Sequence, residues 1–436
     1  MHEFKNKLIF RLIMVCMIII VFSLPVLGQD ILIRNATVIT GTGETIENGS
    51  VLVQNGKITR IGANISAPSG VKVVDGSGKF VMSGIIDAHS HLSINGINEG
   101  TTQNSAMADV SDALRIDDYG TWRALAGGVT AIHTLHGSAN HFGAKDEVLK
   151  LKWGRSIEEM KIEDNPEGLK MALGENPLRR ETRYPNTRMG QEFQIRSYFI
   201  QAQEYKKAWD DYEAKVAGKM SLTEAEKEFG PIPPRKDLRL ETLKDVLEGT
   251  IRVHVHGYVN SEMAMMLEMA KDFGFHITSF EHVLEGFMIA DEFAEQGTVA
   301  SAFVDSWNYK VEASQATPFM TALMTERGAV VNLHSDSGER IRRLNLDAAK
   351  TLRYGDTMTE TDALKTVTLN AAIGIDLEHR MGTLEVGKDG DISIWDAHPL
   401  SVYSKCVMTI IEGEVFFDRN EALTTEKWLQ GVKPIF

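Results

Sequence analysis

Histidines recur in this sequence at spacings that suit metal binding. His89 and His91 stand two residues apart at the end of an apolar run, and His254 and His256 repeat that spacing. Side chains two apart on a strand point to the same side, so each pair would present two imidazoles together. Imidazole is both a common metal ligand and a common hydrogen-bonded core group, so one isolated pair fits either role. Both pairs are therefore candidate metal ligands.

Two further segments end in polar residues of the same kind. His282 closes the apolar run that begins at Phe275, and Asp336 follows another run that ends at His334. Helical stretches separate these runs, and such alternation predicts parallel strands joined by helices. In a (β/α)8 barrel the carboxyl ends of the strands meet at one face, where active sites are built. We therefore expect these polar strand ends to converge.

Short strands and tight turns occupy both ends of the chain. The pair Asn55-Gly56 is typical of a hairpin turn between strands expected at 50–53 and 58–61. Further strands are expected at 31–40, 391–395, 407–411 and 414–417. The two terminal segments are thus expected to form one small β domain beside the α/β part.

A resemblance to a known family connects these patterns. The phrases GIIDAHSH at residues 84–91 and MGTLEVGKDGDI at residues 381–392 resemble those of the amidohydrolase superfamily, and the nearest group is similar to its imidazolonepropionase-related members. The resemblance implies an α/β fold, a distorted (β/α)8 TIM barrel with a small β-sandwich domain formed by the N- and C-terminal segments. The metal ligands that it implies are His89, His91, Glu175, His254, His282 and Asp336.

Several assignments within this set stay open at the level of sequence. Either His254 or His256 supplies the ligand of its strand, and we expect His254 to bind metal and His256 to contact substrate. Glu175 is expected to bridge the metal because it emerges at a strand end, with Lys170 and Lys152 as the alternatives. His136, Arg183 and Arg188 are the other expected substrate contacts, since arginine is suited to clamping a substrate carboxylate.

Composition limits the classes of partner. The chain has 46 Lys and Arg against 60 Asp and Glu, a formal net charge of -14, and no basic run. These numbers argue against nucleic-acid binding. Residues 1–28 have a basic start, an uncharged run at 12–27 and a small residue at the end, which predicts a signal peptide, an exported chain in the periplasm or outside the cell, and no stable membrane anchor after cleavage. An uncleaved anchor is the alternative.

The domain prediction follows from these boundaries. We expect a signal peptide at 1–28, β-sandwich segments at 29–80 and 381–436, and a barrel at 81–380 with a helical insertion at about 155–248. Within the insertion, residues 191–220 predict a helix that either packs on the surface or caps the site. The sequence leaves homo-oligomer formation open.

These residues predict a hydrolase with a small-molecule substrate. Neutral imidazoles and carboxylates suit one or two zinc ions, which would activate a water molecule for attack on a carbonyl carbon. Asp336 and His282 are the expected catalytic residues, with Asp336 carrying the proton to a departing nitrogen. The expected reaction is hydrolysis of an amide, cyclic amide or peptide C-N bond. The alternatives are a metallo-dipeptidase, an N-acyl deacetylase or a catalytically silent ligand-binding barrel.

Overall fold

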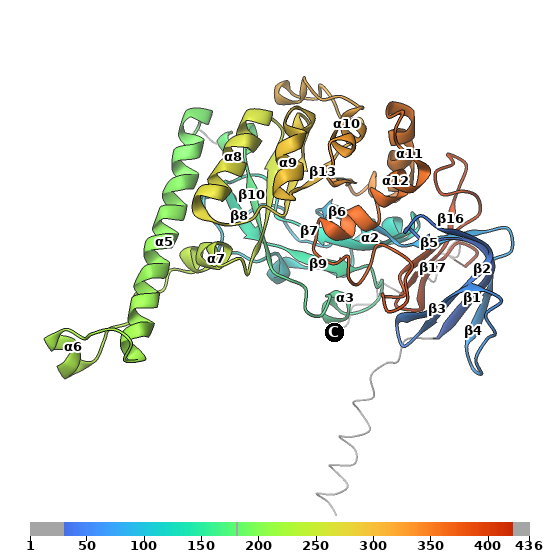
Figure 1. Cartoon of the computed structure of the whole chain (residues 1–436), viewed down its shortest axis with the longest axis horizontal. Coiled ribbons are helices and arrows are strands. Elements are labelled where there is room, and N and C mark those ends of the chain that lie inside the picture. Colours follow the sequence, from blue (N-terminus) through green and yellow to red (C-terminus); the bar gives the residue numbers. More distant parts are fainter. Residues whose placement is uncertain (1–29, 180–181, 422–436) are drawn as a thin grey trace, which may run out of the picture.

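The computed structural model describes residues 30–179 and 182–421, so the predicted signal peptide lies outside the described residues. The chain has a mixed α/β architecture, in which a sheet built from both ends of the chain lies beside a buried set of mainly parallel strands (Figure 1). Across the described ranges, none of the helices combines the length and the apolar character needed to cross a membrane.

The terminal sheet contains eight strands. They are β1 (Ile31–Ile39), β2 (Thr45–Gln54), β3 (Lys57–Ala63), β4 (Lys72–Asp75), β5 (Phe80–Ser83), β15 (Ile392–Trp395), β16 (Cys406–Ile411) and β17 (Glu414–Asp418). The two ends of the chain meet where β5 pairs antiparallel with β15. The strands form one connected sheet that branches at β1, which pairs with both β4 and β5, and the predicted sandwich of two facing sheets stays a prediction. Asn55 and Gly56 adopt positive φ angles of 52° and 78°, as their hairpin turn requires.

The buried strands carry the candidate site. They are β6 (Ile85–Ser90), β7 (Val129–Thr134), β8 (Phe142–Lys145), β9 (Glu147–Lys150), β10 (Gly168–Ala172), β11 (Arg252–Gly257), β12 (Ser279–His282), β13 (Val299–Ala302) and β14 (Val331–Leu333). Strands β10 to β14 pair in parallel in chain order. The intervening helices include α8 (Asn260–Phe273), α9 (Ala290–Gln296) and α10 (Met320–Glu326), with α11 (Leu344–Tyr354) after β14. Their apolar faces, including Met266 and Phe293, join the main core.

We expected a ring of eight parallel strands, but the third strand in chain order is antiparallel to both of its neighbours. The segment from β8 to β9, interrupted only by Asp146, pairs antiparallel with β10 at one end and with β7 at the other. As a result, the strands are hydrogen bonded as a six-stranded and a three-stranded sheet. The ends of β6 and β14 are joined by side-chain and loop contacts, since Asp87 accepts hydrogen bonds from the backbone and the hydroxyl of Ser335.

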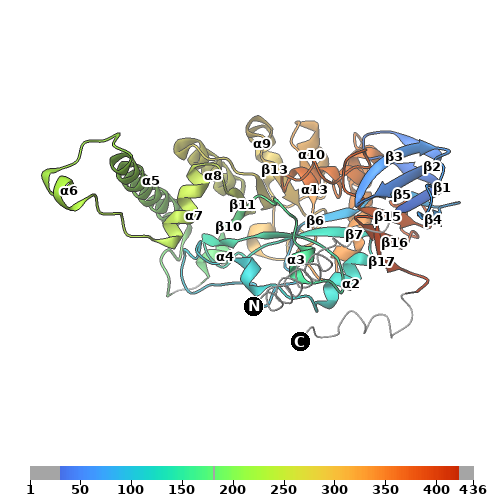
Figure 2. The same cartoon turned by 90° about the horizontal axis from the view of Figure 1, so that it is seen from below.

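The helical insertion is shorter than the predicted range 155–248, because β10 lies inside that range and pairs within the buried sheet. After β10 come α4 (Glu175–Leu178), α5 (Gln191–Val216), α6 (Glu224–Phe229) and α7 (Leu238–Leu247). Helix α5 packs against α7 and α8 and buries Ile195 and Phe199, whereas α6 buries no residue. Figures 1 and 2 show α5 and α6 at the end of the molecule opposite the terminal sheet, so α5 is a surface helix here.

A buried charge cluster fastens β9 to the terminal sheet. The ammonium of Lys150 lies 2.5 Å from Asp389, 2.7 Å from Glu412 and 3.1 Å from Asp391. Its side chain is 1% exposed, and these carboxylates raise the pKa of Lys150 above its ordinary value despite burial. The cluster therefore holds the site-bearing strands against the sheet that both chain ends build.

We expect Lys150→Ala to lower the free energy of unfolding by about 3 to 5 kcal/mol, because it leaves buried carboxylates without their shared cation. Denaturant unfolding measures this loss. The matched control is Lys207→Ala, which removes an exposed ammonium paired with Asp211 and is expected to change stability by at most about 0.5 kcal/mol. Equal effects of the two substitutions would contradict this account of the cluster.

Candidate metal centre

His89 and His91, at the end of β6, present ring nitrogens to Asp336. The Nδ1 of His89 lies 3.0 Å from a carboxylate oxygen of Glu281, and that of His91 lies 2.7 Å from the carbonyl oxygen of Leu135. Because these oxygens accept, each Nδ1 carries the proton and each Nε2 keeps a lone pair. The two Nε2 atoms lie 3.8 Å and 3.3 Å from the Oδ1 of Asp336. Three electron-rich atoms face one space, which suits a cation.

Three further buried imidazoles complete this cluster. The ring of His282 lies 4.8 Å from that of His89 and 4.6 Å from that of His256, and the ring of His334 lies 4.9 Å from that of His89. Among the described residues, the Nδ1 atoms of His256, His282 and His334 have no hydrogen-bond partner. Burial lowers the pKa of all three rings, to about 3 for His334. A neutral imidazole with an unpartnered ring nitrogen can bind a metal.

The backbone is strained at two of these positions. His282 and Asp336 adopt φ angles of 75° and 46°, in the left-handed region that residues other than glycine rarely adopt. The amide of Asp336 donates to the carbonyl oxygen of His89 at 3.2 Å, which fixes the turn. Strain of this kind persists only where the surroundings enforce it, and it concentrates at functional sites. One ligand atom each from His89, His282 and Asp336 lie within 4.8 Å of one another.

The structure brings Lys170 rather than Glu175 to the histidines. Glu175 begins α4 and pairs with Arg179 at 2.5 Å and with Lys310 at 3.5 Å. Lys170 lies inside β10, is 1% exposed, and acts electrostatically on the rings of His89 and His282. Glu175 is thus engaged by two cations at the start of α4, while the strand β10 holds Lys170 in the core. Lys152, the other alternative, pairs with Glu412.

The structure places His256, rather than His254, beside the histidines around His89. His254 lies deeper in the core, where its ring is 4.5 Å from that of His133, and it does not join the cluster around His89. His256 lies next to His282 instead, and its Nε2 accepts a hydrogen bond from the amide of Asn176 at 3.3 Å. Both side chains point inward because they are two residues apart, so only their depth along β11 separates them.

His136 and Arg188, which were expected to contact substrate, instead bind other groups of the protein. The Nδ1 of His136 donates to Gly137 at 2.7 Å, and its Nε2 accepts from the amide of Glu99 at 2.7 Å. Arg188, 49% exposed, donates to Glu262 at 2.9 Å and to Glu312 at 2.6 Å. Neither residue lines the pocket that reaches Asp336. The structure therefore assigns both to the support of nearby loops.

Arg183 is a brace between loops. Its guanidinium donates to the carbonyl oxygens of Gly100 and Thr102 at 2.8 Å and of Pro177 at 3.1 Å, and also to that of Ala139. These bonds direct the guanidinium toward protein carbonyls, contrary to the expected carboxylate clamp.

We expect Arg183→Ala to lower the free energy of unfolding by at least about 2 kcal/mol, because several charge-assisted hydrogen bonds are lost together. The KM for acidic substrates should change by less than about threefold, since the guanidinium is engaged by the loops. Unfolding curves and steady-state kinetics measure the two effects. A large rise in KM with unchanged stability would instead support the prediction that Arg183 binds a substrate carboxylate.

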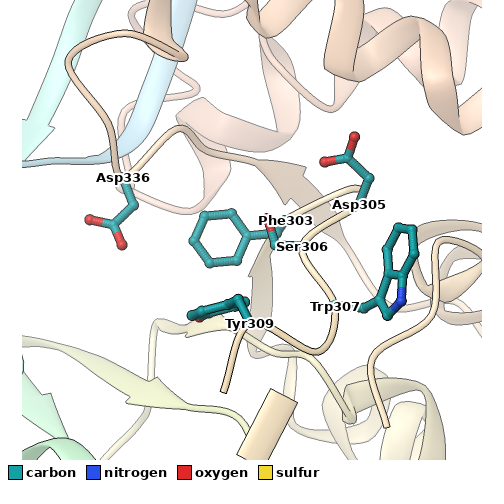
Figure 3. Close-up of a pocket in the computed structure, with 6 residues that line it drawn as sticks. All are labelled: Phe303, Asp305, Ser306, Trp307, Tyr309 and Asp336. Atoms are coloured by element: carbon teal, nitrogen blue, oxygen red, sulfur yellow. The ribbon is translucent and has the colours of Figure 1, made fainter. Parts of the chain in front are cut away.

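A pocket of about 390 Å³ opens beside Asp336. Figure 3 shows Asp336 and the rings of Phe303 and Tyr309 around the same space, with Asp305 and Trp307 on the far side of the rings. Phe303 stacks on His282 with ring centres 4.9 Å apart, which links the pocket wall to the histidine cluster. The side chain of Asp336 is 30% exposed, so a small molecule in the pocket can contact it.

Sequence reasoning missed the aromatic and cationic groups near the pocket. The hydroxyls of Tyr258 and Tyr309 lie 2.6 Å apart, and the ammonium of Lys310 lies 4.0 Å from the centre of the Tyr258 ring. Tyr309 and Lys310 come from the loop after β13, where no periodic pattern marks a residue as functional. Tyr258 follows the second His-x-His pair by two residues, and this spacing was the one available signal.

Known proteins resemble the chain over most of its length. A model of the amidohydrolase family matches residues 80–422. Amidohydrolase tasK from Hapsidospora irregularis is 29% identical over 435 residues, which cover 90% of this chain and 43% of that protein, so this chain spans less than half of its relative's length. Dihydropyrimidinase from Dictyostelium discoideum is 38% identical over 104 residues, covering 23% of this chain and 18% of that protein.

A solved structure of 32% sequence identity matches most of the chain. It is an amidohydrolase from Thermotoga maritima MSB8, with a TM-score of 0.79 and 32% identity, and the match covers 89% of this chain and 100% of that chain. The shared mixed α/β fold and the family match over residues 80–422 agree on the same assignment. This chain belongs to the amidohydrolase family.

Proposed function

We propose that this protein is a zinc-dependent hydrolase that cleaves the C-N bond of a small amide or cyclic amide. The observation that carries the proposal is the arrangement of His89 and His91, whose Nε2 lone pairs face Asp336 at the edge of an aromatic pocket. Neutral nitrogen ligands with a carboxylate match the ligand preference of zinc. Phe303 and Tyr309 line the pocket with aromatic faces, which suit a planar substrate.

Each group has a role that follows from its position. When bound, a zinc ion lowers the pKa of a water molecule toward about 7 and polarises the substrate carbonyl. His89, His91, His256 and His282 would hold one or two such ions, and Lys170 is the proposed bridging residue when two are bound. Asp336 would accept a proton from the attacking water and deliver it to the departing nitrogen, which leaves readily only when it is protonated. The ring of Phe303 stacks on that of His282 and covers it on the pocket side.

The test of the proposal is chelation followed by metal return. Chelated protein should lose hydrolysis of its substrate and regain it with zinc, because the histidines alone supply no electrophile. The substrate panel should include simple amides, lactams, dihydropyrimidines, N-acyl amino acids and dipeptides. Full activity after chelation would overturn metal dependence. Bound metal without hydrolysis across the panel would favour a silent binding protein.

We also propose that the chain is exported. Its first 28 residues have the composition of a cleaved signal, with a basic start and an uncharged run. N-terminal sequencing of the mature protein should begin near Gln29. Recovery of the uncleaved chain in the membrane fraction would contradict cleavage.

A further inference from the structure

A second cluster of potential ligands lies deeper in the core, apart from the histidines around His89. It contains His133 on β7, His254 on β11 and Asp146, the single residue between β8 and β9. All three side chains are 0% exposed. The Nε2 of His133 lies 3.1 Å from Oδ1 of Asp146, and the Nε2 of His254 lies 3.9 Å from Oδ2. The ligand atoms all lie within 4.8 Å of one another.

The outer hydrogen bond of His133 fixes which ring nitrogen carries its proton. Its Nδ1 lies 3.2 Å from the carbonyl oxygen of Ala88, which can only accept. The proton of the neutral ring is therefore on Nδ1, and the Nε2 lone pair points at the carboxylate of Asp146.

The same reasoning applies to His254. Its Nδ1 lies 2.8 Å from the hydroxyl of Ser279, and that hydroxyl donates its one hydrogen to Glu281 at 2.5 Å. Ser279 must then accept from Nδ1 of His254, so the Nε2 of His254 also keeps its lone pair. Two lone pairs and a carboxylate are thus turned toward each other inside the protein.

None of these inward-facing atoms makes a well-oriented hydrogen bond among the described residues, although Nε2 of His133 and Oδ1 of Asp146 lie 3.1 Å apart. The unpartnered atoms are Nε2 of His133, Nε2 of His254 and both carboxylate oxygens of Asp146. Burying such atoms without a donor is costly, and two lone pairs against a carboxylate repel one another. Arg252 attracts the carboxylate of Asp146 electrostatically but gives it no hydrogen bond, because its guanidinium donates to the carbonyl oxygens of Ile375 and Pro166. A cation among the three side chains satisfies all four atoms.

We propose that His133, Asp146 and His254 bind a further zinc-type cation inside the core. Ligands about 2.0 to 2.1 Å from a tetrahedral zinc ion lie about 3.3 to 3.5 Å from each other, and the distances of 3.1 Å and 3.9 Å fall on either side of that value. The backbone leaves room for this arrangement: a Cβ at Gly168 would come within 2.3 Å of the Asp146 carboxylate. The outer hydrogen bonds to Ala88 and Ser279 orient the two rings, as partners of metal-bound histidines do.

This ion would hold the two buried sheets together. His133 belongs to the three-stranded sheet and His254 to the six-stranded sheet, and Asp146 marks the point where the strand pairing changes from β10 to β7. Hydrogen bonds also connect this inner site to the cluster nearer the pocket, here called the upper cluster, which consists of His89, His91, His256, His282, His334 and Asp336. From His254 the hydrogen bonds run through Ser279 to Glu281, which accepts from Nδ1 of His89. His254 thereby acts as a positioning residue for His89, a role that rests on the proposed function.

Crystals of the zinc-loaded wild-type protein test the proposal directly. Anomalous difference maps recorded above and below the zinc absorption edge should show a peak between His133, Asp146 and His254. A peak at the upper cluster with none at the inner one would overturn this inference and leave the proposed function intact. The reverse pattern would support the inner site and overturn the upper zinc site. A direct hydrogen bond between His133 and Asp146 with no peak between them would identify a protonated imidazole instead.

Metal analysis in solution gives an independent measure. Asp146→Asn should bind one equivalent of zinc per chain fewer than the wild-type protein. Asp391→Asn is the matched control, since Asp391 is equally buried but lies beside Lys150 in the terminal sheet. The control should keep the full zinc content. Equal zinc content in the wild-type protein and Asp146→Asn would overturn the inner site, and the crystallographic map decides the matter should the variant fail to fold.

Discussion

Asp336→Asn is expected to lower kcat by about 10²- to 10⁴-fold, the contribution typical of a positioned general acid and base. The carboxylate is the one group of the upper cluster that also lines the pocket, and it lies 3.3 Å from the Nε2 of His91. An amide of the same size keeps these contacts but cannot accept and return a proton. The histidines remain in place, so the zinc content should be retained. Steady-state kinetics together with metal analysis measure both quantities.

The control for this substitution is Asp291→Asn, which makes the same chemical change at an exposed residue paired with Arg327. It should leave both kcat and zinc content unchanged. A kcat of Asp336→Asn within about threefold of the wild-type value would contradict the proposed proton transfer. Loss of activity that follows loss of zinc would instead make Asp336 chiefly a metal ligand.

Lys170→Gln is expected to lower both the zinc content and kcat, the latter by at least about 10²-fold. Mutating a residue that only hydrogen-bonds to a metal ligand typically costs about 10- to 100-fold in metal affinity or activity, and a ligand itself should cost more. Burial lowers the pKa of Lys170 to about 8, so about a tenth of the amine is neutral at pH 7, far more than for an ordinary lysine. A neutral amine adds carbon dioxide to form a carbamate anion and releases one proton. That anion can bridge two cations as a carboxylate does, and metal analysis with kinetics measures its loss.

Glu175→Gln is the matched comparison, because sequence reasoning assigned the bridging role to Glu175. Its carboxylate pairs with Arg179 and Lys310, so its loss should leave zinc content and kcat close to the wild-type values. If Glu175→Gln lost the metal while Lys170→Gln kept it, the loop would have to rearrange on metal binding and the assignment of Lys170 would be wrong.

The elements around the site could largely be predicted, because their signals are local. Alternation of apolar strands with helices predicted the mixed α/β architecture, and the hairpin at Asn55-Gly56 follows from backbone sterics alone. The antiparallel third strand could not be predicted in this way. Which neighbour a strand pairs with depends on long-range contacts, and here the pairing changes at one residue, Asp146.

The sequence by itself determined which residue types end the buried strands, and therefore that imidazoles and a carboxylate would gather at one site. Only the tertiary structure decided which of the candidate residues lie beside His89. His254 and His256 share a face of β11, and the register pairs His256 with Glu281 and places Lys170 opposite His254. A period of two fixes the direction of a side chain, but its depth in the core is set by the stagger between neighbouring strands. That stagger is a property of the assembled sheet, and no local run of residues encodes it.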